Sequence, residues 1–397
     1  MESYYLGIDV GKFEHQATLV NEQKEMVGQS IRFANNIDSF TNLIDQIKKG
    51  IPEKSNIQAG MESTGHYWLN LDAFLKRSGI ENVQIINPIE TQKISKTRIR
   101  KVKNDKVDSF EIAKIVCDRK NATAIKQNEK LVKLKRLTRF CDKMKRQEKF
   151  IKREIVNLLE VVCPEFEGLF NNIFLKTPLS ILEKYSDLRK LGHVKKEAFA
   201  ELLKKNSRGR IGEAKSELIL QTINNSVGKN YWDEFSVMQI KMLLDNFRLI
   251  EKQVDQLKKE IEKFSDQFED KVYVNSVVGV SSFSAAVYLA ELGDIERFKS
   301  KHQLTAFAGI DASVFESGEY KRKQGNRISK RGSKYLRKQL YYAAKTAIIF
   351  DPEMKKFYEK KKKEGKHYNV IMIAVARKIL MRIYIVLKQK RLYEVIS

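Results

Sequence analysis

The feature that most limits the fold is an apolar repeat in the middle of the chain. From 240 to 264, apolar residues alternate steps of three and four without interruption, at Ile240, Leu243, Phe247, Ile250, Val254, Leu257, Ile261 and Phe264. This spacing puts one apolar stripe along a long helix and is typical of a coiled-coil seam. A looser repeat over 131–162 predicts a second long helix, with Leu134, Cys141, Met144, Ile151, Ile155, Leu158 and Val162. The two helices are expected to pair, either within one chain or between chains.

The first part of the chain has a different pattern. Short strands are expected at 4–10, 14–20 and 26–33, followed by a helix in "NIDSFTNLIDQIKK". A strand at "NIQAGM", a helix over about 64–77, a strand at "VQII" and a helix containing "KNDKVD" complete the order β-β-β-α-β-α-β-α. That order is the ribonuclease H arrangement, although periodicity alone allows other α/β topologies.

These patterns predict an α/β plus all-α fold in three parts. Residues 1–125 are expected to form a ribonuclease H-like domain, and 126–270 a coiled-coil region with a helical insertion at about 164–235. Residues 271–397 are expected to form a mainly helical C-terminal domain.

The charge of the chain limits its partners. Formal net charge is +25 over 397 residues, while 42% of the residues are apolar, so the excess charge does not indicate disorder. A field of this sign attracts nucleic acid, an anionic membrane or an acidic protein. The longest apolar run, 370–387, is interrupted by Arg377, Lys378 and Arg382, which favours an amphipathic helix over a membrane span.

Cysteine usage and the N-terminus indicate the compartment. No signal peptide is visible at the N-terminus, and we expect a cytoplasmic protein. The cysteines have no paired or metal-ligand spacing and are predicted to be buried thiols in a reducing compartment: Cys117, Cys141 and Cys163.

Four acidic residues are the candidate catalytic centre. Asp9 ends the first strand in "LGIDVG", Glu62 ends another in "GMESTG", and Asp105 and Asp108 lie three residues apart on one helix face. In a ribonuclease H arrangement these positions converge. Carboxylates at one point suit a pair of Mg²⁺ ions, with Mn²⁺ as a substitute, for phosphoryl transfer. The alternative is that Asp105 and Asp108 only begin a helix, where the dipole favours acidic residues.

Basic residues surround the acidic pair "KNDKVD". They are expected to bind the phosphates of a nucleic acid: Lys96, Arg98, Arg100, Lys101, Lys103 and Lys106. A second basic run in the C-terminal part has the same expected role: Lys321, Arg322, Lys323, Arg327, Lys330 and Arg331.

Several motifs occur in the order of a known family. "YYLGIDVGKFEHQATLV", "GMESTGHYW", Asn87-Pro88 and "KNDKVDSFEIAKI" resemble the N-terminal domain of the DEDD transposases of bacterial insertion sequences, which are related to the Piv/MooV-type DNA invertases. That domain is similar to the RuvC junction resolvase. "VVGVSSFSAAVYLAELGDIERFKSKHQLTAFAGI" and "FESGEYKRKQGNRISKRGSKYLRKQLYYAA" resemble the C-terminal transposase domain of the family. The resemblance covers nearly the whole chain except 164–235.

The resemblance implies a recombinase that acts on DNA as a homodimer or homotetramer in the bacterial cytoplasm, associated with the nucleoid and with no membrane partner. It implies divalent metal at the four acids and a nucleophilic serine, which by its place in "ESG" is Ser317. It also implies a structured guide RNA, the bridge RNA, that chooses the DNA sites. Ser313, Ser329 and Ser333 are lesser candidates for the nucleophile and are expected instead to cap helices or contact phosphate. Tyrosines interleave with the basic run, where base stacking is an alternative role, but their helical spacing favours a place in the core: Tyr320, Tyr335, Tyr341 and Tyr342.

Other functions fit some of these features. A junction resolvase would need neither the coiled coil nor Ser317, and a DNA invertase would work without a guide RNA. A nucleic-acid-binding protein without activity would not need all four acids. "GIDVG" at 7 and "GIDAS" at 309 imitate the phosphate loops of actin-like kinases, but the glycines of the second are poorly placed to hold ATP phosphates, and a kinase leaves the charge of +25 unexplained.

Overall fold

The computed structural model describes residues 2–62, 67–86, 104–119, 128–312, 316–317, 320–321 and 327–394, with backbone alone at 316–317 and 320–321. The chain divides into two units, Met1–Lys126 and Gln127–Ser397. The predicted combination of an α/β first part with a mostly helical remainder is confirmed. The predicted boundaries of the three parts stay a prediction.

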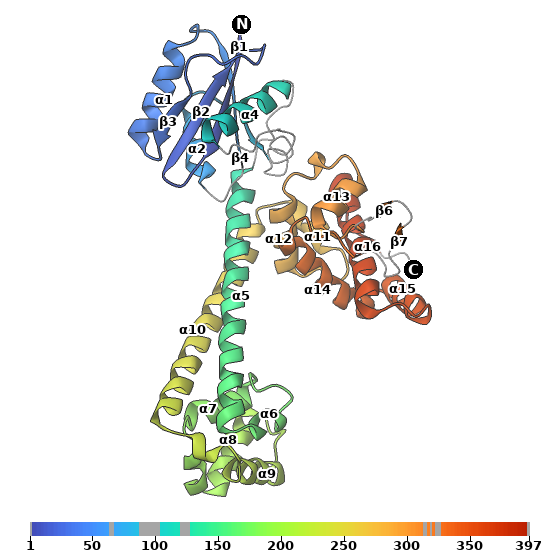
Figure 1. Ribbon diagram of the computed structural model, residues 1–397. Coiled ribbons are helices and arrows are strands. Elements are labelled where there is room, and N and C mark those ends of the chain that lie inside the picture. The colour runs from blue at the N-terminus through green and yellow to red at the C-terminus, as the bar shows by residue number, and fades with distance from the viewer. Residues whose placement is uncertain are drawn as a thin grey trace. The chain divides into compact units, whose positions relative to one another are not determined.

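The first unit is built on a mixed five-stranded sheet (Figure 1). Its strands are β1 (Ser3–Val10), β2 (Glu14–Val20), β3 (Ile31–Ala34), β4 (Asn56–Glu62) and β5 (Val83–Ile86). They lie in the order β3-β2-β1-β4-β5, with β1 antiparallel to β2 and parallel to β4. The helices of this unit are α1 (Ile37–Lys49), α2 (Trp68–Arg77) and α4 (Asp105–Asp118). Along the chain, these elements follow the predicted order.

The two faces of the sheet carry different helices. Alternate side chains of a strand point to opposite faces, so Leu6 and Ile8 pack with α1 and α2, whereas Tyr5 packs with α4. Gly7 lies directly under α4, where an added Cβ would be 2.1 Å from the backbone oxygen of Ser109. The lack of a side chain at Gly7 therefore allows α4 to lie close against the centre of the sheet.

One predicted strand is shorter than expected. The strand predicted over 26–33 is β3, which begins only at Ile31, and Met26 makes an isolated bridge to Val20. The chain turns before the strand, because Lys24 and Gly28 both have positive φ angles, 65° and 73°. The predicted start of the second helix, at residue 64, lies outside the described residues.

The second unit contains the two long helices α5 (Glu129–Val162) and α10 (Glu234–Ser265). They run antiparallel and pack together within the chain: Leu134 clusters with Ile261 near one end, and Ile155 clusters with Ile240 near the other (Figure 1). Every seventh residue of the predicted seam is buried, at Ile240, Phe247, Val254 and Ile261. The predicted seam is thus covered by a helix of the same chain.

Short helices connect α5 to α10, as predicted for 164–235. They are α6 (Glu165–Gly168), α7 (Lys176–Lys184), η1 (Leu188–His193), α8 (Lys196–Asn206), α9 (Glu213–Asn224) and η2 (Lys229–Tyr231). Their apolar side chains, such as Phe166 and Phe199, form one cluster with the adjoining ends of α5 and α10.

The last part of the chain is a group of helices around an apolar core. Its elements are α11 (Asp270–Asn275), α12 (Ser282–Leu292), η3 (Ile295–Arg297), α13 (Lys301–Ala308), β6 (Glu316–Ser317), β7 (Tyr320–Lys321), α14 (Lys334–Phe350), α15 (Pro352–Lys363) and α16 (Tyr368–Gln389). The run predicted to be an amphipathic helix lies in α16, whose apolar side chains contribute to this core. In the described part of the chain, no helix is both long and apolar enough to cross a membrane. The three cysteines are free and buried, as predicted.

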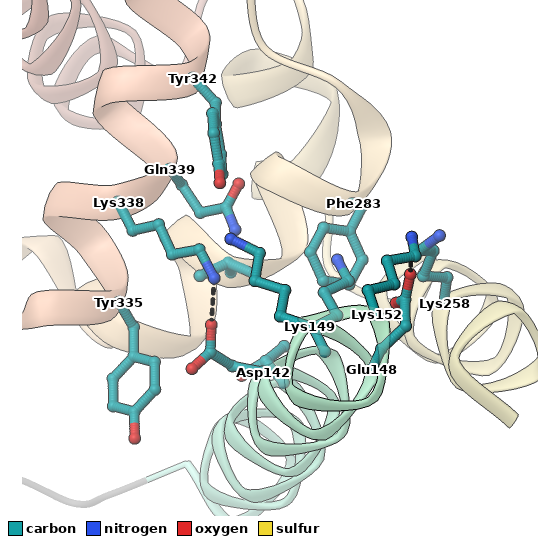
Figure 2. Close-up of a pocket in the computed structure, with 13 residues that line it drawn as sticks. Asp142, Glu148, Lys149, Lys152, Lys258, Phe283, Tyr335, Lys338, Gln339 and Tyr342 are labelled. Carbon is teal, nitrogen blue, oxygen red and sulfur yellow. Dashed lines mark hydrogen bonds and ion pairs between the residues drawn. The ribbon is translucent and has the colours of Figure 1, made fainter. Parts of the chain in front are cut away.

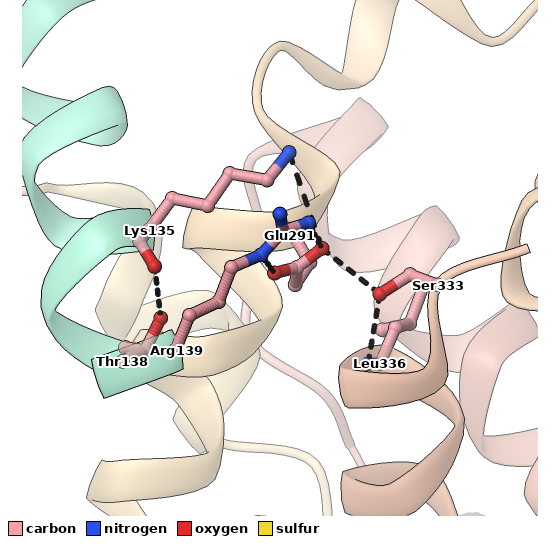
Figure 3. A network of polar contacts seen from close by, with 6 residues as sticks. All are labelled: Lys135, Thr138, Arg139, Glu291, Ser333 and Leu336. Carbon is pink, nitrogen blue, oxygen red and sulfur yellow. Dashed lines mark hydrogen bonds and ion pairs between the residues drawn. The ribbon is translucent and has the colours of Figure 1, made fainter. Parts of the chain in front are cut away.

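A buried carboxylate joins these helices to α5 (Figure 3). Glu291 of α12 is 1% exposed and accepts hydrogen bonds from Arg139 Nε at 2.8 Å and Nη2 at 3.0 Å. Lys135 lies 3.9 Å away, and the Ser333 hydroxyl donates to Glu291 at 2.9 Å. Burial alone would raise the pKa of Glu291, but Arg139, Lys135 and Ser333 outweigh it and hold this pKa below its ordinary range. The network fixes α12 and the start of α14 against α5.

Candidate active site

Two of the predicted acids end neighbouring parallel strands. Ile8 of β1 is paired with Met61 of β4, so the next residues, Asp9 and Glu62, are neighbours at the carboxyl ends of the two strands. Both are half-buried. Because side chains alternate along a strand, Asp9 lies on the same face as Gly7, the face that α4 covers. Glu62 lies on that face too, since Gly60 contacts Val116 of α4.

The other two acids lie in the first turn of α4. Asn104 caps this helix, its side chain accepting from the backbone N–H of Lys106 at 3.1 Å. Asp105 is exposed and Asp108 is half-buried. The far end of α4 lies near the start of β1, because Cys117 contacts the chain just after β2. The first turn therefore lies toward the carboxyl ends of β1 and β4. The acidic start also suits the helix dipole, which fits both the metal-site prediction and the alternative that Asp105 and Asp108 only begin a helix.

The four acids have the right chemistry for a hard divalent cation, since carboxylate oxygen is the ligand that Mg²⁺ prefers. Their side chains are not gathered as a finished site: among the described residues, no group of three His, Cys, Asp or Glu side chains is placed to hold a metal ion. Asp9, Glu62 and Asp108 each take part in a polar or electrostatic interaction of their own. The backbone thus brings together the two strand ends and the helix start, and the side chains would have to turn to share one ion.

Ser317 lies in β6, which pairs with β7 so that Ser317 is opposite Tyr320. Its side chain is outside the described residues. The base of this segment is closed by a bridge between Ala312 and Ile328 and by a hydrogen bond from the Ser329 hydroxyl to the Asp311 carboxylate. Ser329 therefore has a structural partner.

Ser333 caps α14, accepting from the backbone N–H of Leu336 at 3.2 Å. The expectation that Ser333 caps a helix is confirmed. Ser313 lies outside the described residues.

The predicted phosphate-binding residues are only partly described. Lys106, Arg327, Lys330 and Arg331 are exposed. The other predicted members lie outside the described side chains: Lys96, Arg98, Arg100, Lys101, Lys103, Lys321, Arg322 and Lys323.

The sequence interpretation missed a pocket in the second unit (Figure 2). Tyr335 and Tyr342, predicted to belong to the core, line this pocket together with lysines of α5 and α10, and Tyr342 is 45% exposed. Tyr341 does pack against the core, as predicted. The spacing of the tyrosines along α14 shows which ones share a face, but not which face is covered.

Comparison with known proteins identifies the class of this chain. A family model described as a transposase of the DEDD type matches residues 6–164, and one described as a transposase of the IS116/IS110/IS902 family matches residues 272–359. The first match contains Asp9, Glu62, Asp105 and Asp108, and the second contains Ser317. These matches define a transposase, an enzyme that recombines DNA.

Two relatives align over nearly the whole length of the chain, and a third over part of it. A protein of insertion element IS116 from Streptomyces clavuligerus is 21% identical over 98% of this chain and 96% of its own. The pilin gene-inverting protein of Moraxella bovis is 24% identical over 99% of this chain and 98% of its own. A protein of insertion element IS900 from Mycobacterium paratuberculosis is 31% identical over 30% of this chain and 29% of its own. The chain is thus similar to DEDD-type transposases in its N-terminal part and to transposases of the IS116/IS110/IS902 family in its C-terminal part.

Proposed function

We propose that this transposase cleaves and exchanges DNA strands at a divalent-metal centre held by Asp9, Glu62, Asp105 and Asp108, in a ribonuclease H-like domain. The observation that carries the proposal is the pairing of Ile8 with Met61, which makes Asp9 and Glu62 neighbours on the face that α4 covers. The first turn of α4, with the other two acids, lies toward the same strand ends. The strand order β3-β2-β1-β4-β5 agrees with the ribonuclease H arrangement.

The chemistry follows from the charges. Bound Mg²⁺, or Mn²⁺ in its place, would supply a positive centre that activates the attacking oxygen and stabilises the leaving one. The acids hold that charge at the strand ends. Without a cation, four carboxylates would repel a DNA phosphate. The basic residues on either side of Asp105 hold the strand by its phosphates.

Ser317 is the proposed second centre. The oxygen of its hydroxyl forms a bond to a DNA phosphorus as the bond to one strand oxygen breaks, and the hydroxyl proton passes to that departing oxygen. The phosphodiester is thereby conserved as a serine–phosphate link until a new strand displaces the serine. Support comes from the match of the second family model over this segment and from the basic residues that follow it.

Site choice and assembly complete the proposal. A structured guide RNA would pair with the DNA sites, and the chain would act as a homodimer or homotetramer. The net charge of +25 supports the binding of more than one polyanion. To test this part, the protein would be purified from its host with nucleic acid retained, and the bound RNA sequenced. A single structured RNA is expected, whereas a random RNA mixture would contradict guidance.

The metal centre is tested by charge-removing substitutions. Asp105→Asn and Asp108→Asn should each abolish Mg²⁺-dependent strand cleavage while DNA binding is kept. Asp118→Asn, at the other end of α4, is the matched control and should cleave normally, because Asp118 is 62% exposed and its ion-pair partner among the described residues is Lys24. Cleavage by the Asp105→Asn and Asp108→Asn variants would reject the assignment.

The serine is tested by trapping the link. The reaction would be stopped with denaturant, and peptides from 314 to 320 searched by mass spectrometry for an attached nucleotide. Ser317→Ala should lose the adduct and strand exchange but keep DNA binding. An adduct on Ser329 instead, or normal recombination by Ser317→Ala, would remove Ser317 from the mechanism.

DNA inversion is a second candidate outcome. It is favoured by the pilin gene-inverting protein, which matches over 99% of this chain. A plasmid that carries two copies of a candidate site, in inverted or in direct orientation, distinguishes inversion from excision. Inversion reverses the segment between the sites, whereas excision removes it.

A further inference from the structure

The pocket in the second unit lies between four helices that are far apart in the sequence. It has a volume of about 340 Å³ and is lined from α5, α10, α12 and α14. Figure 2 shows Tyr335, Lys338, Gln339 and Tyr342 along the α14 wall, with Lys149 extending toward them from α5. The volume lies in the lower part of the range of about 300–1,000 Å³ typical of small-ligand sites. It suits one nucleotide and is too small for a duplex.

The lining carries an excess of positive charge. Its ionisable side chains are five lysines and two carboxylates: Lys145, Lys149, Lys152, Lys258, Lys338, Asp142 and Glu148. The carboxylates already have partners in the wall. Lys338 pairs with Asp142 at 2.6 Å, and Lys152 pairs with Glu148 at 2.6 Å.

Lys145 and Lys149 have no carboxylate partner among the described residues. Burial lowers the pKa of the Lys145 ammonium, and the positive charges of Lys258 and Lys338 lower it further. A bound anion would relieve this crowding of like charges.

The pocket also has aromatic walls. Phe283 of α12 lies on one side, with the Lys145 ammonium 4.0 Å from its ring centroid. Tyr335 and the partly exposed Tyr342 are presented by α14. Between them, the carbonyl oxygen of the Gln339 amide accepts from Ser284 at 3.2 Å, which leaves the amide N–H₂ available as a donor. An aromatic surface, a neutral donor and nearby cations match a nucleobase attached to a phosphate.

We propose that this pocket binds one unstacked nucleotide of a single DNA strand, with its base against Tyr342 and its phosphate at Lys149 and Lys145. The inference rests on the proposed function in that DNA is the substrate, but it concerns a site outside the four acids and Ser317. If the pocket bound only phosphate groups, its lysines would be sufficient and its aromatic rings would have no role. Capture of one base would hold the strand in register while the rest of it lies elsewhere on the protein.

The test measures binding of a short fluorescent single strand to the full chain by anisotropy. Tyr342→Ala should weaken binding about tenfold, as expected for loss of one stacked base. Lys149→Gln should weaken binding by about threefold and lower its salt dependence. The matched controls lie on the same helices and outside the pocket: Phe350→Ala on α14, where Phe350 is 70% exposed, and Lys143→Gln on α5. Both controls should bind as the unaltered protein does.

A strand that contains one abasic residue distinguishes recognition of the base from recognition of the phosphate, because it lacks one base and keeps every phosphate. If the pocket holds a base, that strand should bind more weakly, and Tyr342→Ala should cause no further loss. A strand carrying 5-iodouracil should crosslink under light to the peptide that contains Tyr342. Crosslinks only at other segments, or unchanged binding by both Tyr342→Ala and Lys149→Gln, would overturn the proposal.

Two further measurements show whether the bound nucleotide belongs to a DNA strand, to RNA or to the pool of free nucleotides. A deoxynucleoside monophosphate that displaces the strand at equal concentration would overturn the strand assignment in favour of a free nucleotide. A Tyr342-dependent preference for RNA of the same sequence would overturn the DNA assignment. The proposed function is judged separately: loss of cleavage in Asp105→Asn together with normal strand binding by both Tyr342→Ala and Lys149→Gln would reject the pocket and leave the metal centre in place.

Discussion

Removing Glu291 and removing Arg139, the two partners of the buried ion pair, should lower the free energy of unfolding by different amounts. Glu291 is 1% exposed, whereas the Arg139 side chain is 43% exposed and can turn to water when its partner is lost. Glu291→Gln keeps the shape and one acceptor but loses the charge, for which we expect a loss of about 1–3 kcal/mol of unfolding free energy. Arg139→Met leaves a buried carboxylate whose remaining described partners are Lys135 at 3.9 Å, the Ser333 hydroxyl and the more distant charge of Arg297. This change should cost about 3–5 kcal/mol.

The order of these losses is the prediction. Urea denaturation followed by far-ultraviolet circular dichroism would rank the variants, and hydrogen exchange of peptides from α12 and α14 would locate the effect, because a chain of two units need not unfold in one step. Arg139 also lies 4.8 Å from the ring centroid of Tyr335, and Tyr335→Leu removes that contact while the Arg139–Glu291 pair is kept. The double variant Arg139→Met with Glu291→Leu should be more stable than Arg139→Met. If Glu291→Gln lowers the free energy of unfolding more than Arg139→Met does, leaving the buried carboxylate without its arginine is not the larger cost, and the prediction is wrong.

The contribution of Glu291 to the pH dependence of stability should have opposite signs in the unaltered protein and in Arg139→Met. The pKa of Glu291 is held below its ordinary value of 4.5, so its stabilisation is present above pH 4.5 and is lost as pH falls through the lowered pKa. In Arg139→Met, burial would dominate and raise the pKa of Glu291. This variant should therefore regain part of its stability when the pH falls from 7 toward 4.5, relative to the unaltered protein.

Three other substitutions test different parts of the molecule. Val254→Asp should lower the free energy of unfolding by several kcal/mol, unlike Gln253→Asp at an exposed position, and light scattering should show unchanged mass because α10 pairs with α5 in the same chain. Burial lowers the pKa of His15, so stability should fall as the pH drops below about 6.5, its ordinary pKa, and His15→Phe should remove that dependence in urea titrations. Lys101→Gln and Lys103→Gln should each reduce the slope of log affinity against log salt by about one, whereas unchanged slopes would contradict contact with phosphate.

The parts of the fold that the sequence predicted well are those set by local periodicity. The seam from Ile240 to Phe264 needs only the spacing of its own side chains, and the structure buries every seventh position of it. The partner helix had a looser pattern, and spacing alone left open whether the two helices pair within one chain. That choice depends on the connection through α6 to α9, a segment in which no motif was visible.

The candidate site was predictable in its backbone and not in its side chains. Asp9 and Glu62 lie at the ends of apolar strands, so their places could be read from the sequence. The order of the strands is a non-local property, because β1 pairs with both β2 and β4. Whether three carboxylates point at one ion depends on rotamers, on which periodicity gives no information.

The pocket gave no local signal at all. Its walls come from positions between Thr138 and Tyr342 on four helices. Along α14, Tyr335 and Tyr342 are seven residues apart and so share a face, which fits a core position and a pocket wall equally well. Lys145 and Lys149 on α5 look like an ordinary solvated face. Only the packing of α12 and α14 against α5 gives these residues a common role.

The two proposed centres lie in different units, so the proposed active site joins them either within one protomer or across two. Asp105 belongs to Met1–Lys126 and Ser317 to Gln127–Ser397. If each active site joins the acids of one protomer to the serine of another, mixing Asp105→Asn protein with Ser317→Ala protein creates one site with both centres intact. The mixture should then recombine DNA although neither variant does so alone. If both centres come from the same protomer, every site in the mixture lacks one of them, and the mixture should stay inactive. The measurement is recombination of a labelled substrate after the variants are unfolded together and refolded, with each variant treated alone as the control. An inactive mixture whose mixed oligomers are shown by mass spectrometry would reject assembly across protomers.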